Sequence, residues 1–409
     1  MAQDAHCVSR LAPISSRGHV FRIQDGGRVP RKQDPLKVGV LFSRSGTTFV
    51  TEQEHIAGTM LAIDEINKAG GVCGHELVPV GYDPGASNDA YRALTRRMLA
   101  EDEIDVIFGC SMSASRKAVL SIVERHNGLL FYPSMYEGFE YSENLVYAGA
   151  TANQLCPPLA DYLLERHGGR IFLAGCDYIF PRESNRVMRD LIEAKGGDIV
   201  GERYIPLGAS PAIVAEVVEE IRQTAPDAIF STVIGTAAHA FYARYDAAGI
   251  DRATCPVASL TMAESEVAHI GPERCDGHIL ASTYFQTIDR PENSEFVAAF
   301  KARYGATATT SIYSEPAYLQ VHLFARALER VGTVDPRRIA LDVLGDEFEA
   351  PEGPVCVDPD TRHLWLTPRI GVARRDGLFD IVWEGGALIR PDPYLANTWF
   401  EEPSLREWS

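Results

Sequence analysis

A short run of hydroxyl and basic side chains, SASRK at 113–117, lies three residues after the apolar segment DVIFG, where a helix is predicted to begin. Free backbone N–H groups at the start of a helix attract a ligand that carries an oxygen atom. Ser113 also suits the N-cap position, with Arg116 and Lys117 on a solvated helix face. The two roles are compatible, since one hydroxyl can cap a helix at the edge of a binding site.

The usual catalytic and nucleotide-binding motifs are missing from the sequence. There is no G-x-x-x-x-G-K-[ST], no H-E-x-x-H, no G-x-S-x-G, and no G-x-G-x-x-G after a predicted strand. The glycine-rich GGVCG at 70–74 follows a predicted helix and precedes a strand, which is typical of a helix stop. The eight cysteines are scattered, without a Cys-x-x-Cys pair or the histidine spacing of a metal site. We therefore expect no enzymatic activity, no cofactor and no metal ion.

Length and charge narrow the class of protein. A chain of 409 residues predicts two lobes or domains, and its net charge of −17 disfavours binding to nucleic acid or to an anionic membrane. The apolar runs are all shorter than the ~18 residues that a membrane-spanning helix needs. The first 35 residues lack the apolar core of a signal peptide, so the expected location is cytoplasmic. We expect 1–35 to be a disordered leader and 396–409 a tail.

Strand-like and helical patterns alternate along most of the chain. LKVGVLF at 36–42 is typical of a buried parallel strand, and apolar residues recur at helical spacing over 52–68. The alternation predicts an α/β fold with two Rossmann-like, doubly wound lobes and a ligand cleft between them. The pattern at 354–383 predicts an antiparallel hairpin or meander. The predicted first lobe comprises 36–149 and 263–333, and the second comprises 150–262 and 334–395.

The loops after the predicted strands are the expected place for a binding site, because ligands of open parallel sheets bind beyond the carboxyl ends of the strands. These loops are rich in serine, threonine and aromatic residues, and lie at 43–48, 110–115, 132–138, 177–183, 232–236 and 259–266. Tyr132, Tyr136, Tyr178 and Phe180 occur in loops rather than at core periodicity. They therefore predict a pocket with aromatic walls.

Several segments in unbroken order carry a family resemblance: GCSMSASRKAV, LLFYPSMYEGFEY, CDYIFPRESN, FSTVIGT, ASLTMAESEVA and IRPDPY. From about residue 36 to 395 the chain resembles the short-chain amide and urea branch of the type I periplasmic-binding-protein superfamily. The resemblance implies two lobes joined by three hinge crossings, with the ligand between them. It also implies ligand contacts from both lobes. The candidate ligand-binding residues are Ser111, Ser113, Tyr132, Ser134, Tyr178, Phe180 and Thr232.

A neutral amide or urea fits these residue types. Its carbonyl and N–H groups need short neutral polar partners, and its flat faces need apolar walls. An amino acid would instead need a carboxylate clamp and an anion for its ammonium group. Asp177 and Arg182 are available for such roles, but a structural ion pair is the preferred interpretation. Ser111 and Phe180 stand where the most similar member of the branch carries tyrosines, which leaves the identity of the ligand open.

The resemblance implies two functions. The first is a cytosolic sensor that regulates an amidase-type operon through a partner protein, by analogy an RNA-binding antiterminator. The alternative is the substrate-binding component of an ABC transporter for urea, short-chain amides or branched-chain amino acids. A homo-oligomer is compatible with both.

Overall fold

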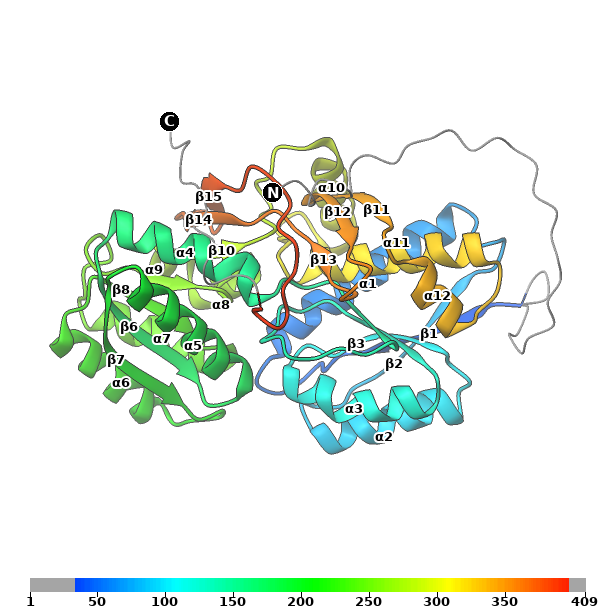
Figure 1. Cartoon of the computed structure of the whole chain (residues 1–409), viewed down its shortest axis with the longest axis horizontal. Coiled ribbons are helices and arrows are strands. Elements are labelled where there is room, and N and C mark those ends of the chain that lie inside the picture. Colours follow the sequence, from blue (N-terminus) through cyan, green and yellow to red (C-terminus); the bar gives the residue numbers. More distant parts are fainter. Residues whose placement is uncertain (1–33, 397–409) are drawn as a thin grey trace.

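The computed structural model describes residues 34–396. The predictions for the leader at 1–35 and the tail at 396–409 lie outside the described residues, apart from 34, 35 and 396. Two α/β lobes lie side by side (Figure 1), the first mainly in blue and cyan, with α11 and α12 in yellow and orange, and the second mainly in green. The predicted fold class is confirmed.

The first lobe is a five-stranded parallel sheet with helices on both faces. Its elements are β1 (Leu36–Leu41), α1 (Phe49–Lys68), β2 (Leu77–Tyr82), α2 (Asn88–Ala100), β3 (Val106–Gly109), α3 (Ser113–Arg125), β4 (Leu129–Tyr132), β5 (Leu145–Tyr147), α11 (Ser314–Val331) and α12 (Pro336–Asp342). The strand order is β2-β1-β3-β4-β5. Apolar side chains of α1, α11 and α12 cover one face, and those of α2 and α3 cover the other.

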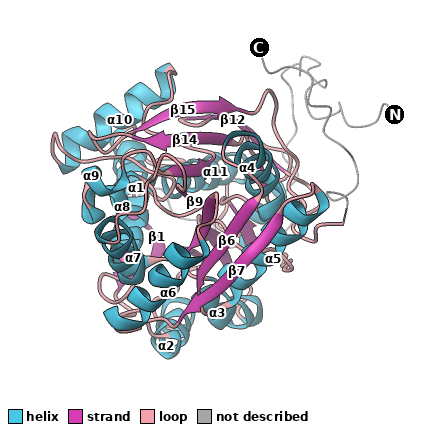
Figure 2. Ribbon diagram, turned by 90° about the vertical axis from the view of Figure 1, so that its left-hand side faces the viewer, coloured by secondary structure: helices cyan, strands magenta, loops and turns pink. Residues whose placement is uncertain are grey.

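The second lobe is a seven-stranded sheet in the order β15-β14-β10-β9-β8-β6-β7. Its elements are α4 (Ala152–Arg166), β6 (Arg170–Cys176), α5 (Ile179–Ala194), β7 (Asp198–Ile205), α6 (Pro211–Thr224), β8 (Ala228–Thr232), α7 (Gly235–Ala247), β9 (Val257–Ser259), α8 (Glu264–Ile270), α9 (Pro272–Cys275), β10 (Ile279–Ser282), β14 (Arg369–Ala373) and β15 (Phe379–Glu384). The strands from β10 to β7 are parallel, and β14 and β15 add an antiparallel edge. Figure 2 shows α6 and α7 on one side of this sheet and α4 and α5 on the other.

The chain crosses between the two sheets three times: after β5, after β10 and after α12. The remaining elements lie within the last two crossings. They are α10 (Pro291–Tyr304) and a small antiparallel sheet of β11 (Glu347–Ala350), β12 (Gly353–Val357) and β13 (Leu364–Trp365). Three crossings agree with the number that the family resemblance implies.

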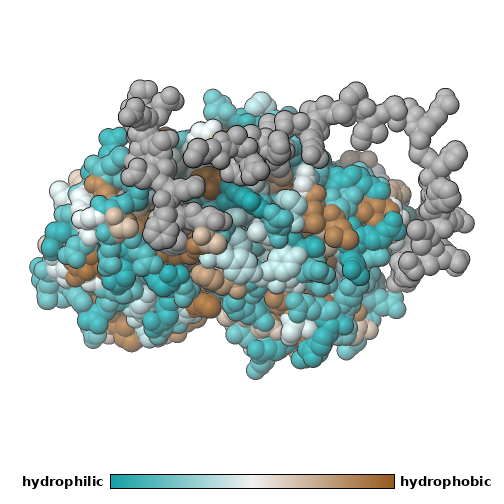
Figure 3. Space-filling view, viewed as in Figure 1, coloured by the Kyte–Doolittle hydropathy of each residue, from teal (hydrophilic) through white to brown (hydrophobic). Residues whose placement is uncertain are grey.

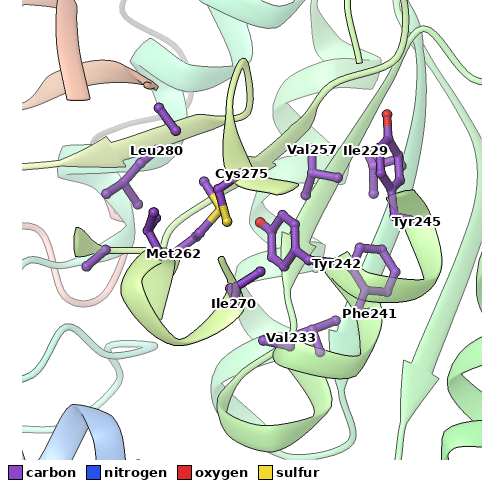
Figure 4. Close-up of a cluster of buried hydrophobic side chains, with 14 of the residues drawn as sticks. Ile229, Val233, Phe241, Tyr242, Tyr245, Val257, Met262, Ile270, Cys275 and Leu280 are labelled. Atoms are coloured by element: carbon purple, nitrogen blue, oxygen red, sulfur yellow. The ribbon is translucent and has the colours of Figure 1, made fainter. Parts of the chain in front are cut away.

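Apolar side chains are concentrated inside the lobes. Figure 4 shows part of one cluster, in which Phe241, Tyr242 and Tyr245 of α7 lie near Ile229 and Val257 of the second sheet, and Leu280 lies farther along it. Hydrophilic residues cover most of the face drawn in Figure 3, with hydrophobic residues in small separate groups. Burial of the strand and helix faces therefore holds each lobe together.

Two segments lie in the lobe opposite to the predicted one. The first segment comprises α8, α9 and β10, all predicted in the first lobe. β10 pairs in parallel with β9 and antiparallel with β14 of the second sheet, and apolar side chains of α8 and α9 pack in the same cluster as those of α7. α12, predicted in the second lobe, packs on α11 and on β4 of the first lobe. The crossings therefore fall after β10 and after α12, rather than near 263 and 334. The antiparallel prediction for 354–383 is confirmed, but its strands divide between the small sheet and the edge of the second sheet.

Candidate ligand-binding site

A small cavity lies where the two lobes meet at the carboxyl ends of their strands. Its volume is about 50 Å³, as space for the centres of water-sized groups. The lining residues are Thr48, Thr51, Ser111, Met112, Ser113, Ser134 and Met135 of the first lobe, Tyr178, Phe180, Ile234 and Thr261 of the second lobe, and Tyr313 of the second crossing. All twelve side chains are uncharged.

Four helices begin at this cavity. Thr48, Met112, Tyr178 and Ile234 line it and are the N-cap residues of α1, α3, α5 and α7. In each of these four described helices the N-cap side chain makes no capping hydrogen bond. The first-turn N–H groups of a helix lack partners within the helix and carry its positive dipole end. The cavity therefore lies at the positive dipole ends of four helices, which suit a ligand oxygen atom.

Ser113 connects the cavity to a buried ionic cluster. Its Oγ donates a hydrogen bond to Glu137 Oε2. Glu137 Oε1 lies 3.1 Å from Arg116 Nη2, and Arg116 Nε lies 2.7 Å from Glu140 Oε1. Arg116 is fully buried, with its guanidinium 4.3 Å from the centre of the Tyr136 ring. The predicted solvated role of Arg116 is therefore wrong, because this side chain supports the loop that carries Glu137.

Ser134, another residue of the cavity wall, contacts a buried histidine. Its Oγ lies 2.9 Å from His55 Nε2, and His55 Nδ1 lies 2.7 Å from the carbonyl oxygen of Tyr313. Burial lowers the pKa of His55 to about 4, so the ring is neutral at pH 7. The first lobe and the second crossing are thus joined through one imidazole behind the cavity wall.

Five of the seven predicted site residues come together in the cavity wall: Ser111, Ser113, Ser134, Tyr178 and Phe180. Their role in ligand binding stays a prediction. Tyr132 and Thr232 lie behind the wall, and both are fully buried. The Tyr132 hydroxyl donates to the carbonyl oxygen of Ser111 at 2.7 Å, and Thr232 Oγ1 donates to Asn185 Oδ1 at 2.9 Å. These internal bonds turn both hydroxyl groups away from the cavity.

The predicted loops contain ten of the twelve lining residues, including Thr48, Ile234 and Thr261. Thr51 and Tyr313 were missed, since neither follows a strand. Thr51 lies in the first turn of α1, and Tyr313 precedes α11 after a long crossing. The Asp177–Arg182 ion pair is present at 2.7 Å, half-exposed, and outside the cavity wall.

Direct hydrogen bonds beside the cavity join the two lobes. Thr51 Oγ1 donates to Glu266 Oε1 of the second lobe at 3.0 Å, and the Thr236 N–H donates to the Thr47 carbonyl oxygen at 3.3 Å. The first residue of α7, Gly235, has a φ of +58° and leaves room for Thr47 only because it lacks a side chain. The structure is therefore a closed form.

A second concavity is larger but differently built. A groove of about 560 Å³ is lined mainly by side chains along α1, α8 and α10, among them Glu54, His269 and Phe300. The smaller cavity is the candidate ligand site, because four helix N-termini meet there at the ends of the strands. Among residues 34–396 there is no His, Cys, Asp and Glu cluster suited to a metal ion. None of the described helices combines the length and apolarity needed to cross a bilayer.

Sequence similarity to known proteins extends over most of the chain in one case and over about a third of it in another. "Leu/Ile/Val-binding protein homolog 6" of Brucella abortus is 23% identical over 340 residues, covering 81% of this chain and 85% of that protein. A stretch of 129 residues is 33% identical to "limonene hydroxylase" of Geobacillus stearothermophilus, and covers 32% of this chain but only 24% of that protein's length.

A similar solved structure is the solute binding protein of an ABC transporter from Rhodopseudomonas palustris BisB5 in complex with 3,4-dihydroxybenzoic acid. It has a TM-score of 0.80 and 21% identity, and the match covers 88% of this chain and 99% of that one, which shows a shared fold. Residues 36–399 match the family model described as a periplasmic binding protein domain. The chain therefore belongs to the periplasmic binding protein family, in its type I form with two doubly wound lobes.

Proposed function

We propose that this protein is the substrate-binding component of an ABC transporter and that its lobes close on a small neutral amide or urea-type ligand. It acts by binding and release, without catalysis. The observation that carries the proposal is the small cavity between the lobes, with its uncharged wall of hydroxyl groups, aromatic rings and helix N-termini.

The size of the cavity favours a small ligand. A water molecule needs roughly 10–15 Å³ of such space, so about 50 Å³ holds roughly three to five non-hydrogen atoms. Urea and acetamide each have four non-hydrogen atoms, whereas leucine has nine. The closed form described here suits the smaller molecules.

The charge of the wall favours a neutral ligand. A zwitterionic amino acid needs a counter-ion for its ammonium group, since an unpaired buried charge is costly. All twelve lining side chains are uncharged, and the nearby Asp177 and Arg182 pair with each other outside the wall. A primary amide places its carbonyl oxygen at the helix N-termini and its N–H groups at the serine hydroxyls, with no charge to neutralise.

Transport is favoured over regulation by the relatives. The Brucella protein is named as a Leu/Ile/Val-binding homolog, and the Rhodopseudomonas protein is a solute binding protein of an ABC transporter. The sensor function rests on the sequence resemblance alone, which includes a resemblance to the negative regulator of an aliphatic amidase operon. The cytoplasmic location, the antiterminator partner and a homo-oligomer stay predictions of that second candidate.

A thermal-shift screen tests the ligand class. A ligand that binds only the folded protein at 100 times its Kd adds about 2.7 kcal/mol of stability, which raises Tm by a few degrees. We expect urea, acetamide and propionamide to raise Tm more than leucine or 3,4-dihydroxybenzoic acid at the same excess. A shift with leucine and none with the amides would contradict the proposed ligand class.

A further inference from the structure

Hydroxyl groups of the cavity wall point their protons away from the cavity. Ser113 Oγ donates to Glu137 Oε2, and Thr48 Oγ1 donates to Glu52 Oε1 at 2.7 Å. Ser134 Oγ hydrogen-bonds His55 Nε2. A hydroxyl has one proton and two lone pairs, so a hydroxyl that has donated inward offers a ligand only lone pairs.

Glu137 cannot exchange hydrogen-bond roles with Ser113. A carboxylate is an acceptor only, and Glu137 is kept as an acceptor by two cations, Arg116 Nη2 at 3.1 Å and Lys117 Nζ at 3.6 Å. Its side chain is almost completely buried, with 1% exposed. The direction of the Ser113 hydroxyl is therefore set by the residue behind it.

His55 sets the direction of the Ser134 hydroxyl in the same way. The carbonyl oxygen of Tyr313, which only accepts, is 2.7 Å from His55 Nδ1, so that nitrogen carries the proton. The ring is neutral, which leaves Nε2 as an acceptor. Ser134 must therefore donate to His55.

We propose that Glu137 and His55 are positioning residues that determine ligand specificity: by holding the protons of Ser113 and Ser134, they make the cavity select a ligand with N–H donors. This inference rests on the proposed function and extends it. A carboxylate offers only acceptors to these two oxygens, whereas the NH₂ group of an amide or urea supplies one donor for each. The helix N-termini on the same wall then serve the carbonyl oxygen.

Acetamide and acetate are the probes that isolate this effect, because they have the same shape and differ in the NH₂ group. A site built to bind an N–H group leaves buried acceptors unpaired when the ligand lacks it. We expect the unaltered protein to bind acetamide at least roughly 100-fold more tightly than acetate in calorimetric titrations at pH 7.5. This comparison needs no variant.

The decisive variant is Glu137→Gln. The amide group introduced at this position keeps its oxygen toward Arg116 and turns its NH₂ group toward Ser113, which releases the Ser113 proton into the cavity. The ratio of acetamide affinity to acetate affinity should then fall about 10-fold or more.

Glu140→Gln is the matched control. Glu140 contacts the same cations, with its Oε1 2.7 Å from Arg116 Nε and its Oε2 3.2 Å from Lys117 Nζ, and its other side-chain contact is the Tyr147 hydroxyl. This variant weakens the same ionic cluster but leaves the Ser113 proton on Glu137. The affinity ratio should therefore stay within about threefold of the unaltered value.

His55→Phe provides a second, independent arm. The new ring keeps the packing against Phe42, whose ring centre lies 5.1 Å from that of His55, but it removes the acceptor for Ser134. The affinity ratio should fall in this variant as well. Acetate binding by the unaltered protein as tight as acetamide binding, or equal ratios in Glu137→Gln and Glu140→Gln, would overturn the inference. If the unaltered protein binds neither amides nor urea, the proposed function itself fails.

Discussion

Replacing Gly235 by alanine should weaken ligand binding by preventing full closure of the lobes. A Cβ atom at this position would lie 2.2 Å from the carbonyl oxygen of Thr47 on the other lobe, whereas ordinary contacts begin near 3.4 Å. The lobes would have to separate by about 1 Å. Overpacking of this kind costs about 1–3 kcal/mol, and here the cost applies to the closed form alone. Because the ligand binds the closed form, its affinity should fall about 5- to 150-fold.

Gly249→Ala is the control for backbone strain. Gly249 follows the other end of the same helix, α7, with a φ of +66°, and a Cβ atom added there would meet no atom within 4 Å. Both variants carry the strain of a left-handed alanine, about 1–2 kcal/mol, and only Gly235→Ala carries the clash between the lobes. Titration calorimetry with acetamide measures the difference. Equal affinities in the two variants would refute the assignment of this contact to lobe closure.

Four further results are expected. Ser113→Ala should weaken acetamide binding about 5- to 150-fold, since one buried N–H group of the ligand loses its acceptor; calorimetry checks this. Tyr178→Ala should remove most of the thermal shift by an amide while ligand-free circular dichroism stays unchanged, because this ring is a wall contributed by the second lobe. Thr232→Val should lower the free energy of unfolding by about 1–3 kcal/mol through the lost bond to Asn185, but leave the affinity unchanged, and unaltered stability would place that hydroxyl elsewhere. Burial lowers the pKa of His55 from 6.5 to about 4, so between these pH values the unfolded chain binds a proton that the folded chain does not, and stability falls as the pH falls. His55→Phe should therefore lose about 2 kcal/mol less stability than the unaltered protein between pH 7.5 and 5, as unfolding in guanidinium chloride at both pH values would show.

Local patterns predict most of the elements. Apolar spacing and turn residues predict helices over 211–224 and 291–304, and α6 and α10 have these bounds in the structure. Each begins with a proline in its first turn and ends at a glycine or a left-handed residue. Hydrophobic periodicity in these segments agrees with the packing that each helix finds in the fold.

The division into lobes is harder to predict, since it depends on pairing between distant segments. The strand at Ile279–Ser282 is as apolar as other buried strands. Its sequence alone therefore does not predict whether it pairs with β9 of the second sheet, as it does in the structure, or with a strand of the first sheet. The short helix Pro336–Asp342 is likewise assigned to a lobe only by its packing on α11.

The cavity was largely predictable, because parallel strands direct their following loops to one edge of the sheet. The two predicted residues that do not line the cavity, Tyr132 and Thr232, each end a strand, and their inward hydrogen bonds depend on partners 21 and 47 residues away. The role of Tyr313 comes from a crossing that brings it 2.7 Å from His55, 258 positions away in the chain. Such contacts follow from the completed fold and leave no local pattern.

A crystal structure of the full chain with acetamide tests the central claim most directly. We predict one acetamide molecule in the cavity between the lobes, with its nitrogen within about 3.2 Å of the Oγ atoms of Ser113 and Ser134 and its oxygen toward the helix N-termini. Density for acetamide only outside this cavity, or in it with the oxygen against the two serine hydroxyls, would contradict the account.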